Sequence, residues 1–189
     1  MSKKMSATEF DLPSIDRISG RSTSITSAFF KAITPVVRPT KEEIERALKI
    51  LGMEEKCVCA YCGGVKSEWD HLRPIVKNKH PTGYITEIAN LVPSCGKCNQ
   101  SKGNKDWREW MNGPAKGSPK SRNILDIEAR MKRLQEYEEW KKPTEIDYPQ
   151  IAGEKDWNDY LALRDEIISK LKEAQAKADS MKSMFKAKQ

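Results

Sequence analysis

Residues 59–111 read CAYCGGVKSEWDHLRPIVKNKHPTGYITEIANLVPSCGKCNQSKGNKDWREWM, and this stretch decides the fold. It holds four of the five cysteines, both histidines and three of the five tryptophans of the chain. Side chains of this kind bind metals or act on protons, so the chemistry of the protein is sought here first. Trp69, Trp107 and Trp110 are expected to cover the small core, because a short unit of this size has few other apolar residues.

The cysteines form two closely spaced pairs. Cys59 and Cys62 make one C-x-x-C pair, and Cys95 and Cys98 make a second, with 32 residues between the pairs. Each pair turns tightly enough to direct both sulfurs at one point, and two pairs complete the tetrahedral shell that suits zinc. Disulfides are the competing interpretation, but the reducing cytoplasm expected for this chain would keep thiols reduced.

A four-cysteine shell leaves no open position on the metal, so we expect one structural zinc ion per chain. Cys57 is expected to be a bystander, although a site that uses Cys57 in place of Cys59 stays open.

Three short motifs follow in order along this stretch: Asp70-His71-Leu-x-Pro, Asn90-Leu-Val-Pro and Cys98-Asn99-Gln-Ser-Lys102-Gly. In order, spacing and residue type they resemble the HNH endonuclease family, with its ββα-metal motif held by a four-cysteine zinc site. The resemblance covers about 55 of the 189 residues. The rest of the chain is compatible with a small restriction-type HNH enzyme.

The resemblance implies a role for each of four residues. His71 is expected to be the general base that takes a proton from water, since an imidazole pKa of about 6.5 suits that task. Asp70 and Asn99 are expected to hold one catalytic Mg²⁺ or Mn²⁺, which prefer oxygen ligands. Asn90 is expected to support the site by bracing the loop and orienting the histidine. Asn99 stands where the family commonly has histidine, a variant that also occurs there.

Neighbouring positions on a strand point to opposite faces, so Asp70 and His71 need a twist at the strand end to serve one site.

Basic residues near the motifs are candidates for DNA binding. They are Lys102, Arg73, Lys77, Lys79 and Lys105. Lys102 lies one helical turn after Asn99 and is expected to contact the scissile or an adjacent phosphate. The others are expected to line the DNA backbone, with a solvated surface as the alternative. His80 is expected to be exposed or near a phosphate, not catalytic.

The charge balance of the whole chain agrees with a DNA partner. The 189 residues include 34 Lys and Arg against 27 Asp and Glu, which gives a net charge of +7. Such an excess favours a polyanion, and with the motifs it indicates double-stranded DNA. The chain is too short for a barrel enzyme with inserted domains. No apolar run approaches the roughly 20 residues that cross a bilayer, and the start resembles no signal peptide, so we expect a cytoplasmic protein without a membrane partner.

Helices are expected on both sides of the nuclease motif. Apolar residues four apart predict a short helix over 24–33. Thr40 and Glu43 form a capping box that predicts a second helix. After the loop of residues 112–121, apolar stripes predict two long helices, the second from about Glu154, which are expected to form a helical hairpin.

The expected fold class is α+β, with a zinc-stapled ββα-metal nuclease core, an N-terminal helical arm and a C-terminal helical hairpin. The expected domains are residues 1–52, an arm and helices with DNA contacts; residues 53–113, the nuclease core with its zinc; and residues 114–189, a linker and the hairpin. The hairpin is the expected contact of a homodimer, because it has apolar stripes and no net charge.

The resemblance implies divalent-metal-dependent hydrolysis of DNA to 5′-phosphate and 3′-hydroxyl ends. One site cuts one strand at a time, so double-strand cleavage needs a dimer or two successive nicks. Three classes stay open: a type II restriction-like enzyme, which is preferred; a nicking, homing or structure-selective HNH nuclease; and a non-catalytic zinc module that binds DNA. The complete set of Asp70, His71 and Asn99 favours an enzyme.

Overall fold

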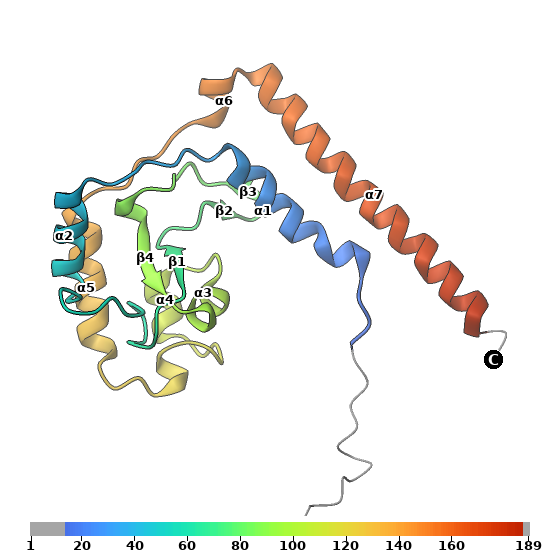
Figure 1. Ribbon diagram of the computed structural model, residues 1–189. Helices are drawn as coiled ribbons and strands as arrows, with labels where there is room; N and C mark the ends of the chain where they lie inside the picture. The colour runs from blue at the N-terminus through green and yellow to red at the C-terminus, as the bar shows by residue number, and fades with distance from the viewer. Residues whose placement is uncertain (1–13, 187–189) are drawn as a thin grey trace, which may run out of the picture. The chain divides into compact units, whose positions relative to one another are not determined.

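A computed structural model describes residues 14–186 of the chain (Figure 1). Residues 1–13 of the expected N-terminal arm therefore lie outside the described residues. Internal contacts divide the chain into two units, one of residues 27–158 and one that combines the described residues 14–26 with 159–186. Between residues 14 and 186, no helix has the length and apolar character needed to cross a bilayer.

A small antiparallel sheet lies at the centre of the unit 27–158. Strand β1 (Glu68–His71) pairs with β4 (Leu91–Ser94), and helix α3 (Gly96–Lys102) follows β4 directly and packs on β1. A second pair, β2 (Val76–Lys77) and β3 (His80–Pro81), forms a short hairpin between them in sequence. The order of strand, strand and helix agrees with the expected ββα arrangement (Figure 1).

The helices before the sheet begin close to the expected positions. They are α1 (Ser22–Ile33) and α2 (Lys41–Ile50). The Thr40 hydroxyl accepts a bond from the Glu43 amide at 3.2 Å, and the Glu43 carboxylate accepts one from the Thr40 amide at 2.9 Å. These two bonds satisfy free amides at the start of α2 and confirm the capping box.

The helices after the sheet do not confirm the expected hairpin. They are α4 (Trp107–Asn112), α5 (Ile127–Trp140), α6 (Tyr148–Ala152) and α7 (Glu154–Lys186). Helix α7 begins where the apolar stripe predicted. Helix α5, however, belongs to the unit 27–158 and packs on α2 and on the short 3-10 helix η3 (Ile88–Asn90), whereas most of α7 belongs to the other unit.

Four aromatic side chains are almost completely enclosed in the core: Tyr61, Trp107, Trp110 and Tyr137. Cys59 and Cys98 lie among them, so the cysteine cluster is part of the core. The expectation for Trp107 and Trp110 is confirmed, but the expectation for Trp69 is wrong because its side chain is 51% exposed. Trp69 alternates with buried Asp70 along β1 and therefore faces away from α3.

Candidate functional site

The four cysteines of the two pairs come together as expected. Their sulfur atoms all lie within 4.8 Å of one another, and the Sγ atoms of Cys62 and Cys95 are 3.8 Å apart. A tetrahedral zinc ion with Zn–S bonds of about 2.3 Å holds its sulfurs about 3.8 Å apart, so the cluster fits a metal ion. Cys57 is exposed and lies outside the cluster, so the first pair is formed by Cys59 and Cys62 and does not use Cys57.

Tight turns place the cysteines. The Gly63 amide donates to the Cys59 carbonyl at 2.8 Å, and the Cys59 amide donates to the Gly64 carbonyl at 2.8 Å. Gly63 has a φ of 72°, in the left-handed region that residues with a β-carbon rarely adopt. The turn therefore requires glycine at this position. In the second pair, Cys95 immediately precedes α3 and accepts the Asn99 amide at 3.0 Å.

An arginine far along the chain completes the surroundings of the cluster. Nη1 of Arg122 lies 3.2 Å from the sulfur of Cys98. Hydrogen bonds from the thiols of Cys59 and Cys98 hold the pKa of Cys62 far below its ordinary value. The pKa values of Cys59 and Cys98 are raised, chiefly by their hydrogen bonds with the other thiols of the cluster. Cys62 is therefore the thiol that ionises first, and the guanidinium of Arg122 lies where it offsets negative charge on the cluster. No motif in the sequence signals this role for Arg122.

Strand β1 and helix α3 bring the two expected ligands of the catalytic metal to one interface. Glu68 and Asp70 lie two residues apart on β1 and share a face, and Asn99 and Lys102 lie three apart on α3 and share a side. Nδ2 of Asn99 donates to Oε2 of Glu68 at 2.5 Å, and Nζ of Lys102 lies 3.0 Å from Oδ2 of Asp70. Asp70 and Asn99 therefore face the same interface.

The Asp70 carboxylate is buried and has two partners on one oxygen. Oδ2 accepts a 2.6 Å bond from the Tyr61 hydroxyl as well as the contact from Lys102. Nζ of Lys102 also donates to the carbonyl oxygen of His71 at 2.8 Å. Burial raises the pKa of Asp70, and the charge of Lys102 and the Tyr61 bond oppose that rise. Sequence reasoning missed Tyr61.

The oxygen donors at this interface fit a hard divalent cation. The amide nitrogen of Asn99 is engaged by Glu68, so the amide oxygen of Asn99 is the atom that could bind a metal. Together with the carboxylates of Asp70 and Glu68, that oxygen completes the kind of donor set that Mg²⁺ and Mn²⁺ prefer. The sequence motifs assign no role to Glu68. Its contact with Asn99 is what identifies it as a residue of this interface.

His71 occupies the last position of β1. Its Nε2 lies 2.9 Å from the hydroxyl oxygen of Thr86. The backbone of Thr86 is fixed, because its amide donates to Pro35 at 3.0 Å and its carbonyl accepts from Val37 at 2.9 Å. Asn90 was expected to orient this ring, but the group that contacts Nε2 is the Thr86 hydroxyl.

The surroundings of His71 keep its ring uncharged. Burial, and then the positive charges of Lys31 and Lys102, lower the pKa of His71 to about 4. At neutral pH the imidazole is therefore in the form that accepts a proton.

Asn90 is completely buried behind the segment that follows β1. Its Oδ1 accepts from the Arg73 amide at 2.8 Å, and its Nδ2 donates to the carbonyls of Arg73 at 3.0 Å and Ile85 at 3.2 Å. The Leu72 amide donates to the backbone carbonyl of Asn90 at 2.8 Å. Asn90 thus ties the residues after His71 to the segment before η3, an arrangement in keeping with a bracing role.

Three of the expected DNA contacts bind groups of the protein itself, Lys102 in the interior and Lys105 at an exposed position. Lys102 is completely buried against Asp70 and presents no ammonium group to a surface ligand. The Arg73 guanidinium lies 3.1 Å from Oε1 of Glu138. The Lys105 ammonium donates to the Ser101 carbonyl at 3.0 Å near the end of α3.

The other two basic candidates, Lys77 and Lys79, are exposed on the β2–β3 hairpin. They are placed where a bound polyanion reaches them without rearrangement of the core.

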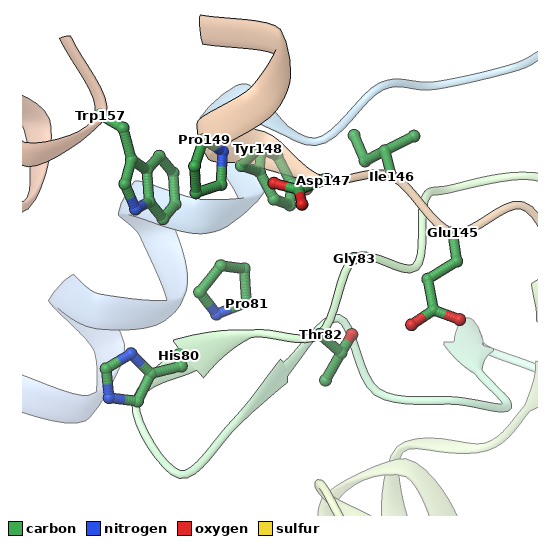
Figure 2. A pocket seen from close by; sticks show the side chains of 10 residues that line it. All are labelled: His80, Pro81, Thr82, Gly83, Glu145, Ile146, Asp147, Tyr148, Pro149 and Trp157. Atoms are coloured by element: carbon green, nitrogen blue, oxygen red, sulfur yellow. The ribbon is translucent and has the colours of Figure 1, made fainter. Parts of the chain in front are cut away.

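A cavity of about 640 Å³ belongs to the same unit but not to this site, and Figure 2 shows the side chains that line it. His80 lines it, together with Glu145, Asp147 and Trp157, and none of the residues expected to be catalytic does. The carboxylates of Glu145 and Asp147 make the cavity unfavourable for a phosphate. His80 is exposed and lies apart from the interface of Asp70 and Asn99.

Comparison with known proteins confirms the resemblance seen in the motifs. Residues 59–105 match the model of the HNH endonuclease family, so the chain contains an HNH endonuclease domain. A CRISPR-associated endonuclease Cas9 of Corynebacterium diphtheriae is 34% identical over 77 residues. That match covers 39% of this chain and 6% of the relative, so the chain spans a small fraction of the relative's length. No solved structure matches the chain.

Proposed function

We propose that the HNH domain of this chain is a DNA endonuclease that hydrolyses phosphodiester bonds to 5′-phosphate and 3′-hydroxyl ends. One observation carries the proposal: Asp70 on β1 and Asn99 on α3 face one interface, with His71 next to Asp70 in the strand. Phosphodiester hydrolysis needs oxygen ligands for a cation and a neutral base. Asp70 and Asn99 supply the oxygens, and His71, whose Nε2 contacts Thr86, supplies the base from the next position of the strand.

His71 takes the proton from the attacking water in this proposal. The Thr86 hydroxyl occupies Nε2, which leaves Nδ1 of His71 as the nitrogen that accepts the proton. For Nδ1 to be unprotonated, Nε2 carries the hydrogen and donates it to Thr86. The neutral ring that this requires agrees with the lowered pKa of His71.

Asp70 and Asn99 hold the catalytic Mg²⁺ or Mn²⁺. Such an ion, when bound, offsets negative charge on the phosphoryl oxygens and the leaving group. Asp70 offers Oδ1, because Oδ2 is engaged by Tyr61 and Lys102. Asn90 keeps the segment after His71 in place through its three side-chain bonds.

Zinc in the four-cysteine cluster has a structural role in this proposal. The second cysteine pair opens α3, and Asn99 follows Cys98 directly, so the ion fixes the helix that carries Asn99. Thiolate ligands persist in a reducing compartment, and we therefore place the protein in the cytoplasm.

For the substrate we propose double-stranded DNA and a type II restriction-like activity. A homodimer formed through the C-terminal helices would bring two sites to the two strands. Leu163 and Ile167 on α7 are 56% and 42% exposed, which supports a contact there. Light scattering tests the dimer, and a monomer at micromolar concentration contradicts it.

Nicking is the second candidate activity. Of the two histidines in the sequence, only His71 follows an aspartate, so one chain carries one such motif. A monomer with one site cuts one strand for each DNA molecule that it binds.

The experiment is cleavage of supercoiled plasmid by the purified chain with Mg²⁺, with Mn²⁺ and with a chelator. The wild type is compared with His71→Ala, and His80→Ala is the matched control because it removes the other histidine outside the site. We expect metal-dependent cleavage by the wild type and by His80→Ala, and none by His71→Ala.

The products separate the classes. Discrete linear fragments support the restriction-like activity, and open circles without discrete fragments support nicking. Binding of DNA on a gel without cleavage by any of the three proteins contradicts the nuclease and leaves a zinc module that binds DNA.

A further inference from the structure

Tyr61 lies inside the first cysteine pair, between Cys59 and Cys62. Its side chain is completely buried, and its ring meets that of Trp110 edge to face with centroids 5.1 Å apart. The Tyr61 hydroxyl donates to Oδ2 of Asp70 at 2.6 Å. A residue of the zinc-binding turn thus touches the carboxylate expected to bind the catalytic cation.

The backbone around Tyr61 has little freedom. Cys59 and Cys62 are held by the cluster on either side of it. The amide of the intervening Ala60 donates to the carbonyl of Pro93 on β4 at 2.8 Å, which joins the turn to the sheet. With the backbone and the ring both fixed, the phenol oxygen of Tyr61 is held beside the carboxylate of Asp70.

This bond determines which oxygen of Asp70 is left for a metal. Tyr61 and Lys102 both bind Oδ2, and the described residues offer Oδ1 no hydrogen bond. The carboxylate is therefore held in one rotamer with Oδ1 turned away from both donors.

We propose that Tyr61 is a positioning residue through which the zinc-binding turn orients Asp70 for the divalent cation. The inference rests on the proposed function of Asp70 as a metal ligand. It gives the structural zinc an effect on the catalytic metal by way of one hydrogen bond. Loss of the phenol removes one of the two partners of Oδ2 and leaves Lys102 in place. The carboxylate is then less restrained, which weakens cation binding without removing a ligand.

The test is Mn²⁺ binding by the zinc-loaded full chain, followed through the electron paramagnetic resonance signal of free Mn²⁺. Tyr61→Phe keeps the ring and removes the hydroxyl. We expect the Mn²⁺ dissociation constant to rise roughly tenfold, the effect of one hydrogen bond to a charged group. Zinc content stays at one ion per chain. In plasmid cleavage the Mn²⁺ concentration for half-maximal rate rises as well, whereas the rate at saturating Mn²⁺ recovers.

The matched control is Tyr148→Phe, which removes a buried hydroxyl 3.1 Å from Oγ1 of Thr34, away from the site. It leaves the Mn²⁺ constant unchanged. Asp70→Asn measures what loss of the ligand itself does. A wild-type constant for Tyr61→Phe, with Asp70→Asn weakened, overturns the positioning role and leaves the nuclease proposal intact. An equal constant for wild type and Asp70→Asn overturns both.

A second substitution keeps the test decisive if Tyr61→Phe loses zinc. Replacing Tyr61 by 3-fluorotyrosine retains the ring and makes the phenol a stronger donor to Asp70. We expect the Mn²⁺ dissociation constant to differ measurably from that of the wild type, with unchanged zinc content. A constant equal to that of the wild type overturns the positioning role.

Discussion

The ammonium group of Lys102 lies 3.0 Å from Oδ2 of Asp70, and the lysine side chain is completely buried. The same group donates to the carbonyl of His71 at 2.8 Å. One side chain of α3 therefore holds two consecutive residues of β1. Its charge is the internal counter-ion of the buried carboxylate, which is expensive to keep ionised without a partner.

Lys102→Met removes this counter-ion and keeps most of the side-chain volume. We expect the free energy of unfolding of the zinc-loaded protein to fall by about 3 kcal/mol, because an unpaired buried carboxylate remains. Urea denaturation followed by circular dichroism measures the change.

Lys105→Met is the control, since its ammonium donates to the Ser101 carbonyl at an exposed position and its loss should cost under about 0.5 kcal/mol. The double variant Asp70→Asn with Lys102→Met should recover part of the loss. Equal stability of Lys102→Met and Lys105→Met would show that the ion pair contributes nothing.

The sequence alone did not predict whether Lys102 is buried or exposed. The motif placed it one turn after Asn99, and that spacing fits both a surface contact with phosphate and an internal ion pair. Only the packing of α3 on β1 separates the two, because it decides whether the ammonium faces solvent. The alternation of β1 was predictable, and it explains why Asp70 is buried while neighbouring Trp69 is exposed.

Local patterns were sufficient for the cysteine cluster, the capping box at Thr40 and the start of α7. Their determinants lie within a few residues of one another. The sequence analysis did not identify three residues of the site: Thr86, Glu68 and Arg122. Each of them contacts a partner at least 15 residues away in the chain. No spacing rule connects such pairs, and only the tertiary structure brings them into contact.

The cysteine cluster predicts which cysteines the protein needs in order to bind zinc. Cys95→Ser removes one ligand, and we expect loss of the ion and unfolding of the nuclease domain, since binding energy of a structural zinc is folding energy. Cys57→Ser should keep one zinc per chain, because Cys57 is exposed and outside the cluster. Native mass spectrometry counts the ion. Zinc loss in Cys57→Ser together with zinc retention in Cys95→Ser would contradict the assignment.

Thr86 is expected to affect the base and not the metal. Thr86→Val keeps the shape and the backbone bonds to Pro35 and Val37 but leaves Nε2 of His71 without its partner. We expect the rate at saturating metal to fall roughly tenfold, as for a misdirected base. The Mn²⁺ dissociation constant should not change. Thr82→Val, which loses a bond to the Pro74 carbonyl instead, is the control. A change confined to the metal constant would contradict this role.

The lowered pKa of His71 makes stability depend on pH in a defined window. The folded value of about 4 lies below the ordinary value of 6.5, so the unfolded chain binds more protons between these values. Stability is therefore fully present above pH 6.5 and is lost as the pH falls toward 4. We expect the free energy of unfolding of the wild type, relative to that of His71→Gln, to drop by about 2 kcal/mol between pH 7 and pH 4.5.

Urea denaturation measures both proteins at each pH, and taking their difference removes the effect of acid on the cysteines. His80→Gln is the matched control, measured under the same conditions. A constant difference between wild type and His71→Gln across this window would mean that the imidazole is not held neutral by its surroundings.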